Sequence, residues 1–265
     1  MGKIKLLIKY FVYKFRCKGA KGHGIHSPFV FDLNRKVLNT KSEYPEYEEI
    51  KKFRRSLVKN REKIRVEDYG AGSVLFSSPE RRVCDIALFA ASSQKTGRLL
   101  FRLARYLRPA VTVELGTSLG FGTLCLAMGG QEGKVYSLDG CRKQLAIAAG
   151  GLKRSGINNV ELIPGSFKDT LPGLMKRLDK VDLVYFDGDH RKESLIWQYG
   201  HCVSKAVPGS VFVIGDIHWS DGMEEAWKVI CDDPAVTLSA DLFYCGLLFF
   251  RKGMVKQHII LTLSG

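Results

Sequence analysis

The residues best suited to chemistry in this chain are an acid, two glycines and a second acid. Glu114 precedes Gly116 and Gly120, and Asp139 follows Gly116 by 23 residues. Glycines at the start of a helix let backbone N–H groups come close to a ligand, and an acid about 20 residues later can accept hydrogen bonds from ribose hydroxyls. We therefore expect a site for a nucleotide-type cofactor in this segment.

These residues must be held by four consecutive elements: a strand, a tight turn, a helix and a second strand. Apolar runs predict the two strands at 111–115 and 134–139, with a helix from residue 119 between them. Strands are also expected at 160–163, 181–187 and 210–215, and helices at 97–107, 141–155, 169–179, 192–206 and 221–232. This alternation predicts an α/β fold with a doubly wound, mostly parallel, Rossmann-like sheet. Residues 236–238 and 242–251 predict a closing antiparallel strand pair.

The N-terminal part of the chain is strongly basic. Residues 1–65 hold 18 Lys/Arg and 6 Asp/Glu, so they carry +12 of the net charge of +14. The segment 3–16 mixes cations with apolar and aromatic residues, which is typical of amphipathic helices that bind surfaces. Contact of residues 1–18 with an anionic membrane or with nucleic acid would explain it, and so would a helix packed on the core with solvated lysines.

Two divisions of the chain follow from composition and periodicity. We expect a basic, mainly helical extension or cap over 1–95, with helices at 29–38 and 46–63, and a cofactor-binding domain over 96–265. Between the first helices, His23, His26, Ser27 and Phe29 lie in a glycine-containing loop, which is either structural or part of an acceptor pocket. A second strand-and-glycine segment at 65–73 lacks a following strand that ends in an acid, and we interpret it as a loop.

Composition excludes several other classes of protein. No apolar run approaches the roughly 18 residues of a membrane span, and the N-terminus lacks the cleavage site of a secretory signal. The seven cysteines are an odd number without a Cys-x-x-Cys pair, which argues against a disulfide framework or a zinc ribbon. We expect a cytoplasmic protein, with peripheral membrane attachment as the alternative.

Acids recur where the predicted strands end. In an open parallel sheet, ligands bind beyond the carboxyl ends of the strands, so these positions are the candidates for a site. They are Glu114 and Gly116, Asp139, Gly165 to Phe167, Asp187 to His190, and Gly215 to His218.

This set of motifs resembles the class I S-adenosylmethionine-dependent methyltransferases, nearest to the small-molecule O-methyltransferases related to catechol and caffeoyl-CoA enzymes. The resemblance covers about residues 96–251, where Gly97-Arg-Leu-Leu precedes Glu114-Leu-Gly-Thr-Ser-Leu-Gly. It implies S-adenosylmethionine as cofactor, with its methionine part near the glycine loop, its ribose on Asp139 and its adenine between Ser166 and Phe167. The implied cofactor-binding residues are Glu114, Gly116, Thr117, Ser118, Gly120, Asp139, Gly165, Ser166, Phe167 and Asp187.

The catalytic candidates follow the fourth and fifth strands. In the resembled family the fourth strand leads to Asp-x-Asp-Lys, and here the same place reads Asp187-Gly-Asp189-His190, with His190 at the position of the base. His190 as a surface residue that caps the next helix, and Asp189 as a helix cap, are the structural alternatives. Asp187, His190, Asp216 and His218 are the catalytic residues that this resemblance implies.

The resemblance leaves a metal ion in doubt. The family's Asp-Asn pair before a tryptophan becomes Gly215-Asp216 when Trp219 is aligned, so one carboxylate ligand is missing. Asp187 and Asp216 would be the ligands of any metal, but a hard divalent ion prefers several well-placed oxygens. We expect that no metal is required.

The leading hypothesis is methylation of a hydroxyl group on a small molecule, by direct displacement with help from a general base. The alternatives are an RNA methyltransferase that uses the basic extension, and a membrane-associated binding protein of the same fold without activity. Gly116-Thr-Ser118-Leu-Gly120 also matches the nucleophile elbow of esterases, but a hydrolase would not need Asp139. The spacing of the glycines fits a nicotinamide dehydrogenase poorly. Homo-oligomers are compatible with all of these readings.

Overall fold

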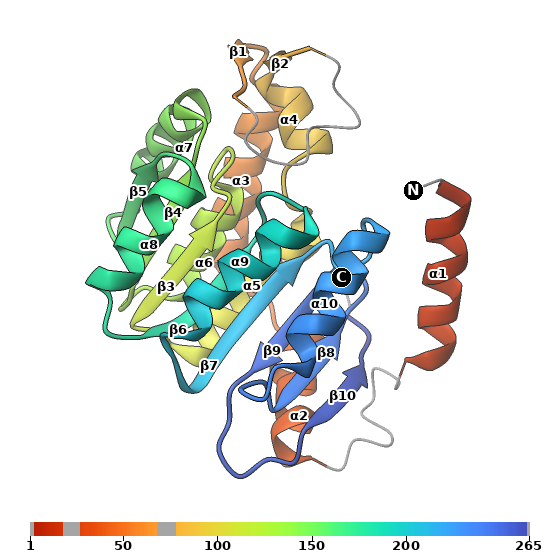
Figure 1. The fold of residues 1–265 in the computed structure, drawn as a ribbon. Coiled ribbons are helices and arrows are strands. Elements are labelled where there is room, and N and C mark those ends of the chain that lie inside the picture. The colour runs from red at the N-terminus through yellow and green to blue at the C-terminus, as the bar shows by residue number, and fades with distance from the viewer. Residues whose placement is uncertain (1–2, 18–26, 68–77, 264–265) are drawn as a thin grey trace. The chain divides into compact units, whose positions relative to one another are not determined.

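The computed structural model describes residues 3–17, 27–67 and 78–263 (Figure 1). The chain divides into two compact units, one of residues 42–177, here called the glycine-loop unit, and one of residues 1–41 and 178–265, here called the terminal unit. This division does not follow the predicted boundary near residue 95, because residues 42–95 group with the glycine loop. The boundary between an extension over 1–95 and a methyltransferase domain over 96–265 remains a prediction made from the sequence.

The glycine-loop unit alternates helices and strands. Its elements are α3 (Glu46–Lys59), β1 (Lys63–Arg65), β2 (Glu80–Arg82), α4 (Val83–Phe89), α5 (Gln94–Leu107), β3 (Val111–Leu115), α6 (Phe121–Gly129), β4 (Lys134–Asp139), α7 (Arg142–Arg154), β5 (Val160–Pro164) and α8 (Phe167–Arg177). Strand β4 pairs in parallel with β3 and with β5 (Figure 1). Because both neighbours are parallel to β4, the three carboxyl ends meet at one edge, where the predicted cofactor residues lie.

Local signals explain the helix that precedes β3. The Ser93 hydroxyl accepts a hydrogen bond of 3.1 Å from the Thr96 N–H and caps the start of α5. The helix ends at Leu107, and the next residue, Arg108, caps it with a left-handed φ of 48°. Between these ends, Leu99 and Leu103 are fully buried, one helical turn apart.

The terminal unit joins the first helices to the last strands. Its elements are α1 (Lys3–Arg16), α2 (Pro28–Leu33), the π-helix η1 (Asn34–Leu38), β6 (Val181–Phe186), α9 (Lys192–Val203), β7 (Ala206–Gly215), α10 (Asp221–Asp232), β8 (Leu238–Asp241), β9 (Cys245–Phe249) and β10 (Gln257–Ile260). Strand β7 pairs in parallel with β6 and antiparallel with β9, which in turn pairs antiparallel with β8. Strand β10 lies parallel to β8 at the edge.

The predicted α/β fold with mostly parallel strands is confirmed, and so is the antiparallel pair near the C-terminus, seen as β8 and β9. Strand β10 was not predicted. The helix expected over 46–63 ends at Lys59, because Asn60 takes an extended conformation and the chain continues into β1. A strand, β2, does follow the 65–73 segment and pairs antiparallel with β1, but it ends at Arg82 and, as expected, not in an acid. The glycines of that segment, like His23 and His26, lie outside the described residues.

Among the described residues, no helix combines the length and the apolar character that crossing a membrane would require.

Candidate functional site

The glycine loop connects β3 to α6 with backbone conformations that favour glycine. Gly116 donates its N–H to the Leu138 carbonyl at 2.9 Å, which ties the loop to the end of β4. Gly120 has a φ of 82°, and a Cβ atom built on it would lie 2.8 Å from the Cβ of Ala148. Both the left-handed backbone and the close approach of α7 therefore require glycine at position 120.

Asp139 holds the loop in place through both of its carboxylate oxygens. Oδ2 accepts the Ser118 N–H at 2.8 Å, and Oδ1 accepts the Cys141 N–H at 2.8 Å. Ser118 has a left-handed φ of 49°, and this conformation directs its N–H toward the carboxylate. Asp139 therefore joins the loop after β3 to the start of α7.

Glu114 lies beneath the loop and not on its outer side. Its side chain is 1% exposed, and its Oε2 accepts hydrogen bonds of 2.5 Å from both Thr123 and Ser137. The Thr117 hydroxyl continues this buried network by bonding to Ser137 at 2.5 Å. The structure therefore gives Glu114 and Thr117 buried partners in the glycine-loop unit, while their predicted contact with a cofactor stays a prediction.

The turn after β5 is attached to the same edge of the strands. Gly165, with a φ of 142°, donates its N–H to the carbonyl of Asp139 at 3.0 Å. Ser166 accepts the Asp169 N–H at 3.3 Å and returns its own hydroxyl proton to the Asp169 carboxylate at 2.6 Å, at the start of α8. Phe167 is half-buried as the first residue of that helix. The structure thus brings together the predicted residues of loop, acid and turn within the glycine-loop unit.

In the terminal unit, Asp187 follows β6, and Gly215 is the last residue of the adjacent strand β7. A Cβ atom built on Gly215 would lie 2.7 Å from Oδ1 of Asp187 and 3.2 Å from the carbonyl oxygen of Phe186. The Asp187 carboxylate therefore occupies the space that a side chain at position 215 would need. This contact gives a steric reason for the glycine where the resembled family has an aspartate.

We expect Gly215→Ala to displace the Asp187 carboxylate and to lower the free energy of unfolding by about 1 to 3 kcal/mol, the usual cost of overpacking. Urea denaturation of the purified protein measures this loss. Gly200→Ala on α9 is the matched control, since a Cβ there meets nothing within 4 Å. Equal stability of the two variants would contradict the proposed contact.

The residues that follow Asp187 have separate partners. Asp189 has a left-handed φ of 58°, and its carboxylate binds the guanidinium of Arg191 through contacts of 2.5 and 2.6 Å. Helix α9 begins after Arg191 without a side-chain cap, so neither Asp189 nor His190 caps it and those two alternatives are wrong. Instead, the His190 Nε2 lies 3.7 Å from Oδ2 of Asp216. Burial raises the pKa of Asp216, and the nearby His190 opposes that shift.

His218 lies between two carboxylates. Its Nδ1 is 2.7 Å from Glu224 Oε1, and its Nε2 is 2.9 Å from Asp241 Oδ2. Burial lowers the pKa of His218, but hydrogen bonds and charge attraction from Asp241 and Glu224 outweigh burial and raise the pKa above its ordinary value of 6.5. With both ring nitrogens engaged by acids, His218 is suited to holding α10 and β8 together. Its catalytic role stays a prediction.

The raised pKa makes stability depend on pH in a definite direction. At a pH below 6.5, His218 is protonated in both the folded and the unfolded chain, and its ion pairs contribute fully to stability. As the pH rises through the raised pKa of the folded state, this contribution is lost. We expect the free energy of unfolding to fall over this range and His218→Gln to reduce the fall, as followed by urea denaturation at a series of pH values. The control His201→Gln should keep the wild-type dependence, and an unchanged slope in His218→Gln would contradict the assignment.

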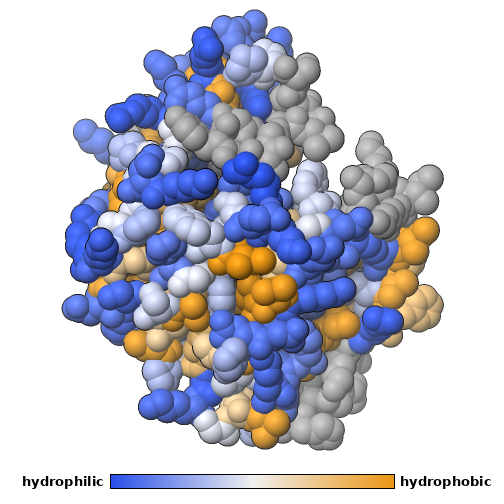
Figure 2. All heavy atoms as spheres, viewed as in Figure 1, coloured by the Kyte–Doolittle hydropathy of each residue, from blue (hydrophilic) through white to orange (hydrophobic). Residues whose placement is uncertain are grey.

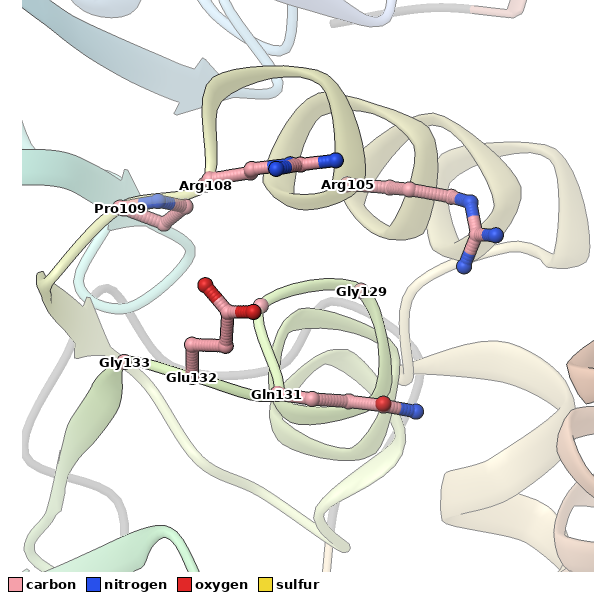
Figure 3. A pocket seen from close by; sticks show the side chains of 8 residues that line it. Arg105, Arg108, Pro109, Gly129, Gln131, Glu132 and Gly133 are labelled. Carbon is pink, nitrogen blue, oxygen red and sulfur yellow. The ribbon is translucent and has the colours of Figure 1, made fainter.

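The glycine-loop unit also has two cavities that are not lined by the predicted site residues. One, of about 190 Å³, opens at the amino ends of β3 and β4, away from the glycine loop; Figure 3 shows Glu132 pointing toward the end of α5 that carries Arg108. The other, of about 440 Å³, has a basic wall from α3 and touches Phe121, the first residue of α6. Its lining includes Lys51, Arg54, Arg55 and Lys59. Arg54 stacks over the Phe121 ring at 5.0 Å and donates to the Ser92 carbonyl at 2.8 Å.

Several residues of the site were not found by sequence reasoning. Ser137 and Thr123 surround Glu114, while Glu224 and Asp241 surround His218. A serine next to the buried Leu138 of strand β4 was a usable signal for Ser137. The partners of His218 gave no such signal, because Asp241 lies 23 residues away in a different strand.

Comparison with known proteins finds methyltransferases. Residues 113–217 match a family described as a methyltransferase domain. A catechol O-methyltransferase of Mycobacterium tuberculosis is 33% identical over 129 residues, which are 48% of this chain and 57% of that protein. The chain therefore aligns with little more than half the length of this relative.

Solved structures extend the likeness in fold. An O-methyltransferase from Bacillus cereus in complex with S-adenosylhomocysteine has a TM-score of 0.56 at 18% identity, and the match covers 79% of this chain and 92% of that one. The O-methyltransferase of tomaymycin synthesis from Streptomyces achromogenes, in complex with S-adenosylmethionine, has a TM-score of 0.56 at 19% identity, with coverage of 84% and 95%.

Proposed function

We propose that this chain is a class I S-adenosylmethionine-dependent methyltransferase that methylates a hydroxyl group of a small molecule, because residues 113–217 match a methyltransferase domain and 129 residues are 33% identical to a catechol O-methyltransferase. The observation that carries the proposal is that Asp139 accepts the Ser118 N–H of the glycine loop on Oδ2 and the Cys141 N–H at the start of α7 on Oδ1. This arrangement supplies an ordered loop at a helix start together with an acid at the adjacent strand end, which are the two features that a ribose-containing ligand requires.

The residues of the glycine-loop unit fit the proposed cofactor. Each carboxylate oxygen of Asp139 accepts a backbone N–H group, and because a carboxylate oxygen can accept more than one hydrogen bond, we assign the ribose hydroxyls to Asp139 as well. Gly116 and Gly120 leave the loop backbone without side chains, next to the methionine part in our assignment, and Gly165 to Phe167 would border the adenine. When bound, the cofactor supplies an electrophilic methyl group on sulfur. We assign Glu114 a positioning role, because it supports the loop through Thr123 and Ser137.

In the terminal unit, we propose that His190 accepts the proton of the acceptor hydroxyl. A histidine changes charge near neutral pH, and Asp216 at 3.7 Å can stabilise the imidazolium that forms when His190 takes up this proton. Removal of the proton raises the nucleophilicity of the oxygen as it attacks the methyl carbon in line. Asp187 would orient the acceptor on the same strand edge.

We further propose that transfer does not require a divalent metal. Asp187 and Asp216 are the two carboxylates that the family pattern retains. Gly215 supplies no third oxygen ligand, and the Asp187 carboxylate lies where a side chain at position 215 would begin. Among the described residues no group of three or more His, Cys, Asp or Glu side chains is arranged to hold a metal. Rates in EDTA and in added Mg²⁺ test this: equal rates support the proposal, and a loss of activity in EDTA that Mg²⁺ restores would contradict it.

The activity is tested in two stages. Calorimetry with S-adenosylhomocysteine measures whether the full chain binds the cofactor product, and failure to bind would end the proposal. Transfer of a labelled methyl group is then followed to catechol-type phenols and, in parallel, to total RNA. Labelling of RNA alone would favour the RNA methyltransferase, and binding without any transfer would favour a non-catalytic protein of the same fold.

A further inference from the structure

Helix α1 contacts the rest of the terminal unit through its polar and aromatic side. Lys9 forms an ion pair of 2.7 Å with Glu224 on α10. The Tyr13 hydroxyl donates to the Leu261 carbonyl at 2.5 Å, and the Tyr10 ring packs edge-on against Phe243 with 5.0 Å between the ring centres. These contacts fix which side of α1 faces the protein.

The opposite side of α1 is apolar and exposed. Its residues are spaced for one face of a helix, at positions 7, 8, 11, 12 and 15. They are Leu7 (55% exposed), Ile8 (59%), Phe11 (60%), Val12 (44%) and Phe15 (90%). We call this set the apolar stripe; apolar atoms of α1 form the orange band at the right edge of Figure 2.

This orientation is the reverse of ordinary packing. An amphipathic helix on a globular protein normally buries its apolar face and exposes its charged face. Here a lysine and two tyrosines face inward, while two phenylalanines and three aliphatic residues face outward. A contiguous exposed apolar surface of this kind marks an interaction site.

The charge of α1 selects among binding partners. Its sequence contains five Lys or Arg residues and no acid, and the exposed Lys14 and Arg16 lie beside Phe15 at its end. In a two-fold pair of copies the stripe would contact itself, which brings together two helices that each carry five cations and no acid. An anionic lipid surface instead accepts the apolar side chains among its acyl chains and the cations among its headgroups.

We propose that α1 attaches the protein to anionic membranes, with the apolar stripe inserted at the level of the acyl chains. The helix of 14 residues is about 21 Å long, and it lies in the plane of the surface in this arrangement. Lys9, Tyr10 and Tyr13 keep the rest of the terminal unit bound to its other side. The proposal is independent of methyl transfer, because it requires only the outer face of α1.

Co-sedimentation of the full chain with vesicles tests the attachment. Vesicles of phosphatidylcholine with about one third phosphatidylglycerol should bind the protein, pure phosphatidylcholine vesicles should bind it at least several-fold more weakly, and salt should weaken the binding. F11Q/F15Q should lower the affinity roughly tenfold or more. The matched control is L88Q/F89Q on α4, whose side chains are 50% and 63% exposed, and it should bind as the wild type does.

Other results would overturn the proposal. They are absence of binding to the anionic vesicles, unchanged binding by F11Q/F15Q, or equal losses in the two double variants. Light scattering adds a further outcome: if the wild type is a dimer without vesicle binding and F11Q/F15Q is a monomer, the stripe is an interface between copies. In a second measurement, the fluorescence of Phe15→Trp should shift to the blue on the anionic vesicles and that of Phe89→Trp should not.

Discussion

Asp139→Asn is expected to weaken the binding of S-adenosylhomocysteine roughly 10- to 100-fold. The amide keeps the shape of the carboxylate but replaces one acceptor oxygen by an NH₂ group. Because Oδ1 and Oδ2 each accept a backbone N–H, from Cys141 and Ser118, the NH₂ group must face a donor in either orientation. The variant therefore loosens the glycine loop. It also removes the negative charge of the carboxylate that, in our assignment, binds the ribose hydroxyls.

Calorimetry measures the affinity, and Asp179→Asn is the control. Asp179 is an exposed aspartate between α8 and β6, so its replacement tests the loss of one negative charge alone. Wild-type affinity in Asp139→Asn, with the fold intact by circular dichroism, would contradict the cofactor site. A vesicle-binding defect in α1 variants would be unrelated to this result, so the two proposals fail separately.

His190→Gln is expected to lower kcat roughly 100- to 1,000-fold while leaving the affinity for S-adenosylhomocysteine unchanged. Glutamine retains a polar side chain of similar reach but cannot accept a proton from the acceptor hydroxyl. Asp216→Asn should have a smaller effect in the same direction, because Asp216 acts through His190 at 3.7 Å. The rate of methyl transfer under saturating cofactor measures both variants.

His201→Gln is the control for the proposed base, since His201 also lies in the terminal unit, on α9, where it packs edge-on against Trp197. It should transfer methyl groups at the wild-type rate. If His190→Gln retains full kcat, another group removes the proton. If kcat and cofactor affinity fall together, His190 has a structural role instead.

The comparison of His190 with His218 shows why side-chain partners matter. Both histidines follow strand ends and both were catalytic candidates on that ground. His190 lies 3.7 Å from the partly exposed carboxylate of Asp216, whereas both ring nitrogens of His218 are engaged by Glu224 and Asp241. A general base must have a ring nitrogen available for the proton, so the structure supports His190 over His218 for this role.

Much of the chain could be predicted from local patterns. The bounds expected for the strands 111–115 and 134–139 and for the helix 221–232 agree with β3, β4 and α10, because apolar period, turn residues and caps are encoded over short distances. Strand β10 escaped prediction, since its sequence Gln-His-Ile-Ile has no strong pattern and it forms by pairing with β8. The π-helix η1 was likewise expected to be an ordinary helical turn.

The sequence by itself determined the class of fold and the residues at the strand ends, because the order of strand, glycine turn, helix and acid is a local property. Only the tertiary structure decided which way those side chains point. It buried Glu114 among hydroxyl groups, gave Asp139 two backbone donors, and placed the Asp187 carboxylate against Gly215. The apolar side of α1 was visible in the sequence, but its exposure was not. That outcome depends on contacts such as the one between Tyr13 and Leu261, which lie 248 residues apart and form only when the chain folds.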